Sequence, residues 1–100
     1  MNSAYQYMVD FTLVGNLSEE FMDLIPYQRV VVNKLFQQGK LVNYALSAEK
    51  AKVWAIFNAD SESELLKMIN SFPLSKFMEV EISLLSQLDG QKTEPVFSLN

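Results

Sequence analysis

Two segments of this 100-residue chain alternate apolar and polar side chains from one residue to the next, and each predicts a β-strand with one buried face. The first is YQYMVDFTL (residues 5–13), in which Asp10 lies on the polar side. The second is FMEVEISLL (residues 77–85), in which Glu79 and Glu81 lie on the polar side. The apolar sides of both strands need a covering layer, which the intervening residues are expected to supply.

Residues 18–39 are predicted to form the first helix. Ser18 is placed as an N-cap, apolar residues follow at helical spacing, and Gly39 is placed for a C-terminal cap. Pro26 and the run Val30–Val32 are poor helix-interior residues, so a strand competes with the helix here. We favour the helix because the apolar stripe persists. Pro26 is then expected either to kink the helix or to begin its main body as a first-turn proline.

Two further strands and a second helix follow. KLVNYALS (residues 40–47) and KVWAIFN (residues 52–58) predict an antiparallel hairpin joined by the polar turn AEKA. Ser61 and Glu64 have the spacing of a capping box, and Pro73 is expected to end the helix that they begin. The residues predicted to share its apolar face are Leu65, Leu66, Ile69 and Phe72.

The element order is therefore strand-helix-strand-strand-helix-strand, which predicts an α+β fold of the ferredoxin-like βαββαβ type. In this two-layer sandwich an antiparallel four-stranded sheet carries two helices on one face. Residues 1–86 are expected to form this single domain. Residues 87–100 are expected to form a tail, with a turn at Asp89-Gly90 and the apolar residues Val96, Phe97 and Leu99. We favour an inter-subunit arm for this tail over a disordered end.

Composition excludes several classes of function. Eight Lys and Arg against twelve Asp and Glu give a net charge of −4. The sequence has no cluster of basic residues, so a nucleic-acid partner is not expected. The chain has no Cys and no His, which removes thiolate chemistry, the commonest general base and the usual zinc ligands. No apolar run is long enough to span a bilayer and no secretory signal is recognisable, so a soluble cytoplasmic protein is expected.

The end of the second helix and the last strand carry a family resemblance. Phe72-Pro73-Leu74, then Phe77-Met78, then Glu79-Val80-Glu81-Ile82 resembles the corresponding part of muconolactone delta-isomerases. The likeness extends backward through LFQQGKL and VWAIFNADSESEL and covers roughly residues 5–85. It implies a dimeric α+β barrel, larger homo-oligomers and cofactor-free proton transfer on a small lactone. The chain differs from this family in having no His and in carrying Asp10 where the first strand tends to be basic.

Three carboxylates are the candidate acid/base groups. Asp10, Glu79 and Glu81 are expected on neighbouring strands, on the sheet face that the helices leave open. Crowded carboxylates that lose water have raised pKa values, which suits a general acid or base. The competing interpretation is a solvated face, or the polar filling of a dimer barrel. No spaced ligand loop supports a carboxylate metal site, so no metal and no cofactor are expected.

Arg29, Tyr44 and Trp54 are the candidate substrate-binding residues. Arg29 on the first helix is suited to a bidentate contact with a substrate carboxylate, or is simply a solvated charge. Tyr44 and Trp54 lie on the hairpin strands, where core or interface packing is the alternative role.

Two functions remain open from the sequence. One is a cofactor-independent isomerase that shifts a C=C bond in a small lactone or related ring-cleavage product. The other is a non-catalytic module that binds a small organic ligand or assembles with partner chains. In either case a homo-oligomer is expected, since a small domain with an open sheet face gains buried area by pairing.

Overall fold

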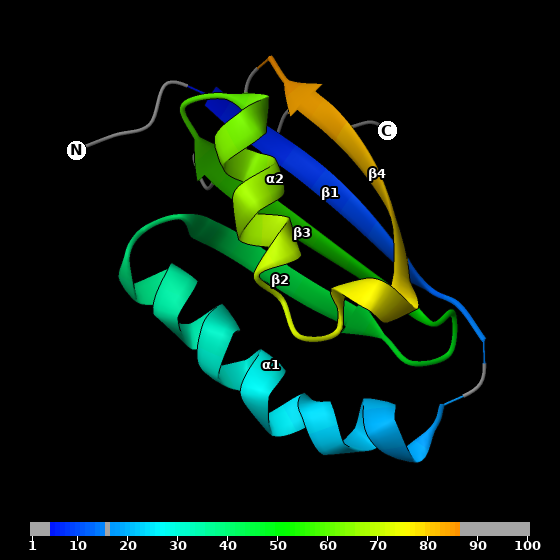
Figure 1. The fold of residues 1–100 in the computed structure, drawn as a ribbon. Coiled ribbons are helices and arrows are strands. Elements are labelled where there is room, and N and C mark those ends of the chain that lie inside the picture. Colours follow the sequence, from blue (N-terminus) through cyan, green and yellow to red (C-terminus); the bar gives the residue numbers. More distant parts are fainter. Residues whose placement is uncertain (1–4, 16, 87–100) are drawn as a thin grey trace, which may run out of the picture.

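The computed structural model describes residues 5–15 and 17–86. Its elements are β1 (Tyr5–Leu13), α1 (Glu19–Gln37), β2 (Leu41–Ser47), β3 (Lys52–Ala59), α2 (Glu62–Asn70), a single 3₁₀ turn (Ser75–Phe77) and β4 (Met78–Leu85). The strands form one antiparallel sheet in the order β2-β3-β1-β4, and both helices cover the same face (Figure 1). The predicted ferredoxin-like fold is confirmed. The tail predicted over residues 87–100 lies outside the described residues.

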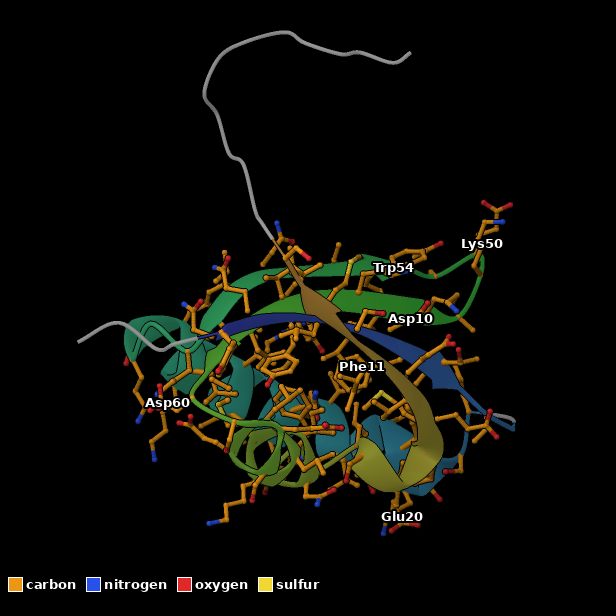
Figure 2. All side chains as sticks on the ribbon, turned by 90° about the horizontal axis from the view of Figure 1, so that it is seen from above. Asp10, Phe11, Glu20, Lys50, Trp54 and Asp60 are labelled. Atoms are coloured by element: carbon orange, nitrogen blue, oxygen red, sulfur yellow. The ribbon has the colours of Figure 1, made fainter. Side chains whose placement is uncertain are left out.

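The strand register separates a buried face from an open one. Phe11 pairs with Val53 and Val80 on the helix side, and its neighbour Asp10 pairs with Trp54 and Glu81. Figure 2 shows Asp10 and Trp54 on the side of the sheet away from the helices, whereas Phe11 points toward them. The alternation in the sequence therefore predicted the two faces correctly, because successive side chains of a strand point to opposite sides.

Helix α1 confirms the helical interpretation of the ambiguous segment. It begins after Ser18, whose Oγ accepts the backbone N–H of Phe21 at 3.1 Å. It then runs without interruption through Pro26, so the first-turn role proposed for this proline is wrong. The helix ends before Gly39, which has a φ of 74° and a left-handed conformation that favours glycine.

The N-terminus of α2 is held by two polar side chains. The Ser61 Oγ accepts the Glu64 N–H at 3.1 Å, and the Glu64 carboxylate accepts the Asp60 N–H at 2.6 Å. The predicted capping pair of Ser61 and Glu64 thus forms, although the Glu64 carboxylate accepts the N–H of Asp60, the residue before the N-cap, and not that of Ser61 itself. Glu64 also pairs with Lys40 at 2.9 Å. The Asp60 N–H and then the Lys40 ammonium lower the pKa of Glu64, and the Glu64 carboxylate raises the pKa of Lys40.

The buried face of α2 differs by one position from the predicted one. Leu65, Met68 and Ile69 are buried, whereas Leu66 is exposed. Residues three and four apart share a helix face, and Leu66 lies one step of about 100° away from Leu65 on the helix.

On β4, Val80 and Leu84 are exposed, although their side of the strand was predicted to face the helices. β4 is an edge strand, and α2 packs on the central strand β3 instead.

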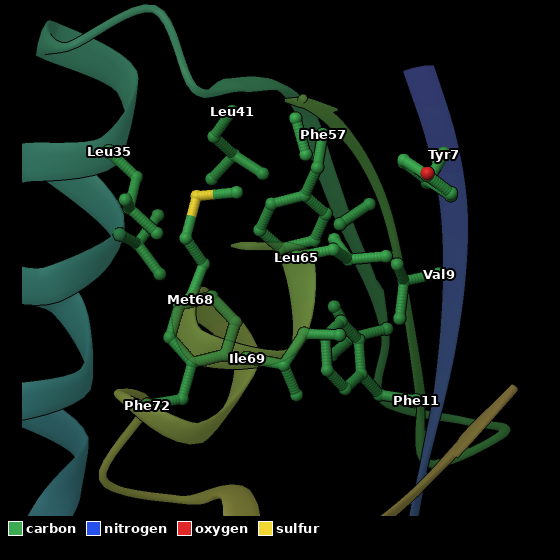
Figure 3. Close-up of a cluster of buried hydrophobic side chains, with 14 residues drawn as sticks. Tyr7, Val9, Phe11, Leu35, Leu41, Phe57, Leu65, Met68, Ile69 and Phe72 are labelled. Carbon is green, nitrogen blue, oxygen red and sulfur yellow. The ribbon is translucent and has the colours of Figure 1, made fainter. Parts of the chain in front are cut away.

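The core is centred on Phe72, which lies two residues beyond the end of α2 and directly before Pro73. It belongs to the hinge, residues 71–77, which joins α2 to β4. Its ring lies 5.8 Å from that of Phe11 and 6.1 Å from that of Phe57, measured between centroids. Figure 3 shows this ring beside Met68 and Ile69 of α2. Beyond Pro73 the chain makes the 3₁₀ turn, and Phe77 packs edge-on against Phe21 of α1 at 5.4 Å between centroids. The hinge therefore joins both helices to the sheet.

Candidate ligand pocket

A cavity of about 540 Å³ lies between α1 and the hairpin strands β2 and β3. It is on the helix-covered side of the sheet. Most of the side chains that line it are apolar, among them Phe21, Ile25, Val32, Leu46, Val53 and Leu74. Three polar side chains join them: Gln28 and Arg29 from α1 and Tyr44 from β2. A mostly apolar hollow with a few convergent polar groups is the usual form of a small-molecule site.

Gln28 is the central polar group of the pocket. It is only 5% exposed and is the one buried polar residue in the described part of the chain. Its Oε1 accepts the Leu74 N–H at 3.1 Å, and its Nε2 donates to the Tyr44 hydroxyl at 3.3 Å. One amide thus connects α1, the hinge after Pro73 and strand β2.

The sequence interpretation missed Gln28. The residue falls on the apolar stripe of α1, at helical spacing from Phe21, Val32 and Leu35, which are all buried. A polar residue on a buried stripe needs a partner, because burial without a hydrogen bond is costly. That signal is present in the sequence, but it does not reveal that the partner is the backbone of Leu74.

Two of the three predicted binding residues line this cavity. Tyr44 is half-buried and bonded to Gln28, and Arg29 is an exposed side chain at the cavity's edge. Within residues 5–15 and 17–86, Arg29 forms no ion pair. Trp54 lies on the opposite face of the sheet, paired with Asp10 in the strand register (Figure 2). The binding role predicted for Trp54 stays a prediction, but it concerns a different surface from that of Arg29 and Tyr44.

The three predicted carboxylates do gather on the open face. Asp10 is the cross-strand neighbour of Glu81, and Glu79 is the neighbour of Thr12 one row away. The Lys52 Nζ lies 2.8 Å from the Asp10 Oδ1 and 3.2 Å from the Thr12 Oγ1. The sheet therefore stands between these carboxylates and the pocket. Their acid/base role stays a prediction.

Within the residues that the structure describes, no three potential acidic ligands come close enough to hold a metal ion. No helix in the same part of the chain is both long and apolar enough to cross a membrane.

A family model described as muconolactone delta-isomerase matches residues 6–89. A crystal structure of a muconolactone isomerase superposes with a TM-score of 0.72 at 16% identity, covering 89% of this chain and 96% of that one. No curated protein matches this chain in sequence.

Two more distant structures have related folds. An AsnC-family transcriptional regulatory protein from Pyrococcus furiosus gives a TM-score of 0.56 at 20% identity, and the match covers 89% of this chain but only 55% of that protein. A protein from Pseudomonas aeruginosa gives a TM-score of 0.50 at 13% identity, covering 89% of this chain and 99% of that one. At these identities the likenesses establish the fold alone.

Proposed function

Since this chain belongs to the muconolactone delta-isomerase family, we propose that it binds a small organic molecule without a cofactor, in the cavity between α1 and the hairpin. The observation that carries this proposal is the cavity itself. Its volume of about 540 Å³ is within the range of ligand pockets, and its lining is apolar apart from the groups of Gln28, Arg29 and Tyr44.

Binding is favoured over catalysis in this cavity because of what lines it. Proton transfer from carbon needs a base within hydrogen-bond reach of the reacting C–H. Among the described residues that line the cavity there is no Asp, Glu or His, and the ionisable side chains are those of Arg29 and Tyr44. The cavity thus offers hydrogen-bond donors to a ligand but no carboxylate base.

A lactone isomerase is the second candidate, and the open sheet face is its site. Asp10, Trp54 and Glu81 occupy one cross-strand row, with Lys52 against Asp10. In this candidate a carboxylate of the row removes the proton from the ring carbon γ to the lactone carbonyl, at the far end of the conjugated double bond. The Lys52 ammonium stabilises the dienolate, and return of the proton to the carbon next to the carbonyl shifts the double bond.

Turnover of muconolactone tests this second candidate directly. Glu81→Gln is expected to abolish turnover, whereas Glu49→Gln, in the hairpin turn, leaves it unchanged. A folded wild-type protein without turnover would eliminate the isomerase candidate and leave the binding function standing.

Ligand binding in the cavity is tested with a neutral apolar probe, the fluorophore phenyl-naphthylamine. Ile25 lines the cavity, so Ile25→Trp is expected to fill part of the space and to weaken binding by about tenfold or more. Met22→Trp is the matched control, because Met22 is an exposed residue of the same helix outside the lining. Fluorescence titration measures both. Equal binding by the two variants would place the probe elsewhere.

We also propose that the chain forms a homo-oligomer through its open sheet face. Met8 is exposed there and lies beside Ile56 and Ser83 in the register, so pairing two such faces removes apolar surface from water. Light scattering coupled to size-exclusion chromatography measures the mass. We expect at least a dimer at micromolar concentration, and a strict monomer would refute this proposal.

A further inference from the structure

The proline of α1 divides this helix into two parts. Pro26 has no N–H, so it cannot donate the helical hydrogen bond to the Met22 carbonyl that would otherwise cross this point. Figure 1 shows the light-blue N-terminal part of α1 at an angle to the cyan part that follows. A missing hydrogen bond and the bulk of the ring are the usual causes of a bend in a helix. Pro26 is therefore the place at which α1 bends most easily.

The two parts of α1 pack on different partners. Val32 and Leu35, which follow Pro26, belong to the continuous buried core of the domain. Phe21, which precedes it, is buried but is not among the side chains of that core. Its ring packs edge-on against Phe77 of the hinge instead, at 5.4 Å between centroids. The part of α1 after Pro26 is thus fixed in the core, whereas the part before it is held by the hinge.

An ion pair lies beside these two rings. Glu20 of α1 pairs with Lys76 of the hinge, and the Lys76 Nζ lies 5.5 Å from the centre of the Phe77 ring. We call the four side chains Glu20, Phe21, Lys76 and Phe77 the latch. Both members of the ion pair are 59% exposed, and exposed pairs contribute little to stability. The charged half of the latch can therefore break and form again readily.

The cavity lies directly behind the part of α1 that the latch holds. Phe21 and Ile25, which both precede Pro26, line it from the helix side, and Leu46 and Val53 line it from the hairpin strands. A rotation of this part about Pro26 moves the first two side chains away from the hairpin and widens the cavity. The core contacts of the helix beyond Pro26 stay in place during such a motion.

We infer that residues 19–25 of α1 form a gate over the cavity, which pivots at Pro26 and is closed in this structure by the latch. The inference rests on the proposed binding function and adds to it how a ligand enters and leaves. A gate that must open for every exchange of ligand controls the rates of association and dissociation. It has less effect on the equilibrium affinity, because both rates change together.

Cross-linking the latch tests the gate. The chain has no cysteine, so pairs of cysteines can be introduced without side reactions. In a variant with Glu20→Cys and Lys76→Cys, a short bis-maleimide cross-linker joins the gate to the hinge. Compared with the same variant before cross-linking, association and dissociation of phenyl-naphthylamine are both expected to slow by about tenfold or more. The Kd is expected to stay within about threefold. Stopped-flow fluorescence measures the rates.

The matched control carries Lys40→Cys and Glu64→Cys. These two residues also form an ion pair between separate elements, but neither lines the cavity. Cross-linking them should change both rates by less than about twofold, because the gate stays free to move. Equal slowing by the two cross-links would overturn the inference, since a general loss of flexibility would then explain it.

Pro26→Ala tests the pivot. Alanine restores an N–H that can donate to the Met22 carbonyl, which stiffens the helix at this point, so both rates are expected to fall by about threefold. Val30→Ala is the control, because it raises the helix propensity of an exposed position of α1 without adding a hydrogen bond. It should leave both rates within about twofold. Unchanged rates in Pro26→Ala, or in the cross-linked latch variant, would overturn the inference while the proposed function stands.

Amide hydrogen exchange detects the motion without any ligand. Cross-linking the latch is expected to slow exchange of the N–H groups of residues 23–25 by about tenfold and to leave those of residues 31–35 within about twofold. No slowing, or equal slowing of the two sets, would overturn the pivot at Pro26. Failure of wild type to bind phenyl-naphthylamine would overturn the proposed function itself, and the exchange measurement would then decide whether the gate moves.

Discussion

Replacement of Phe72 by alanine is expected to lower the free energy of unfolding by about 3–5 kcal/mol, the largest effect that we predict for a single substitution in this chain. Phe72 is 2% exposed and contacts the rings of Phe11 in β1 and Phe57 in β3. Its removal deletes buried apolar area and leaves a cavity where α2, the hinge and the sheet meet. The surrounding elements are held by their own hydrogen bonds, so they collapse into that space only partly.

Urea denaturation followed by circular dichroism measures this loss. Phe36→Ala is the matched control, because Phe36 lies on α1 with 41% of its surface exposed. We expect that substitution to cost less than about 1 kcal/mol, as is usual away from the core. Similar losses for the two variants would show that Phe72 does not hold the centre of the core.

Replacement of Gln28 by leucine is expected to lower the free energy of unfolding by about 1–3 kcal/mol, even though leucine is the more apolar residue. The substitution leaves the buried Leu74 N–H without its acceptor and the Tyr44 oxygen without its donor. An unsatisfied buried donor loses its hydration and gains nothing in return. Gln37→Leu, an exposed position in the last turn of the same helix, is the control and should be nearly neutral. A stability of Gln28→Leu equal to that of wild type would refute the role assigned to this amide.

For a second variant at this position, Gln28→Glu, we can predict how the free energy of unfolding changes with pH. Its protonated carboxyl can accept the Leu74 N–H and donate to Tyr44, as the Gln28 amide does in both bonds. Burial raises the folded-state pKa of the introduced carboxyl above its ordinary value of about 4.3. The stability difference from wild type is therefore smallest below about pH 4 and widens as the pH rises through the folded-state pKa. A difference that does not vary with pH would show that the carboxyl is solvated.

Much of this fold follows from patterns that are local in the sequence. The alternation in residues 5–13 and 77–85 predicted the strands β1 and β4 and their polar faces, and the register confirms that Asp10 and Glu81 are neighbours. The Ser18 and Ser61 caps were predicted because a side chain accepts an N–H only three residues away. Periodicity also favoured a helix through Pro26 against the propensity of single residues.

The candidate site depended on contacts that no local pattern contains. The amide of Gln28 and the N–H of Leu74 are 46 residues apart in sequence, and their bond exists because the hinge folds back against α1. The sequence predicted that the carboxylates lie on the open face of the sheet. It did not predict that Arg29 and Tyr44 line one cavity with Gln28 on the other face, because that depends on how α1 packs against the hairpin. Residue spacing determines the faces of each element, whereas packing of one element on another decides which faces enclose a cavity. The sequence therefore determined the elements, their order, the family and the face that carries the carboxylates, and only the tertiary structure decided that Gln28, Arg29 and Tyr44 line a cavity on the other face.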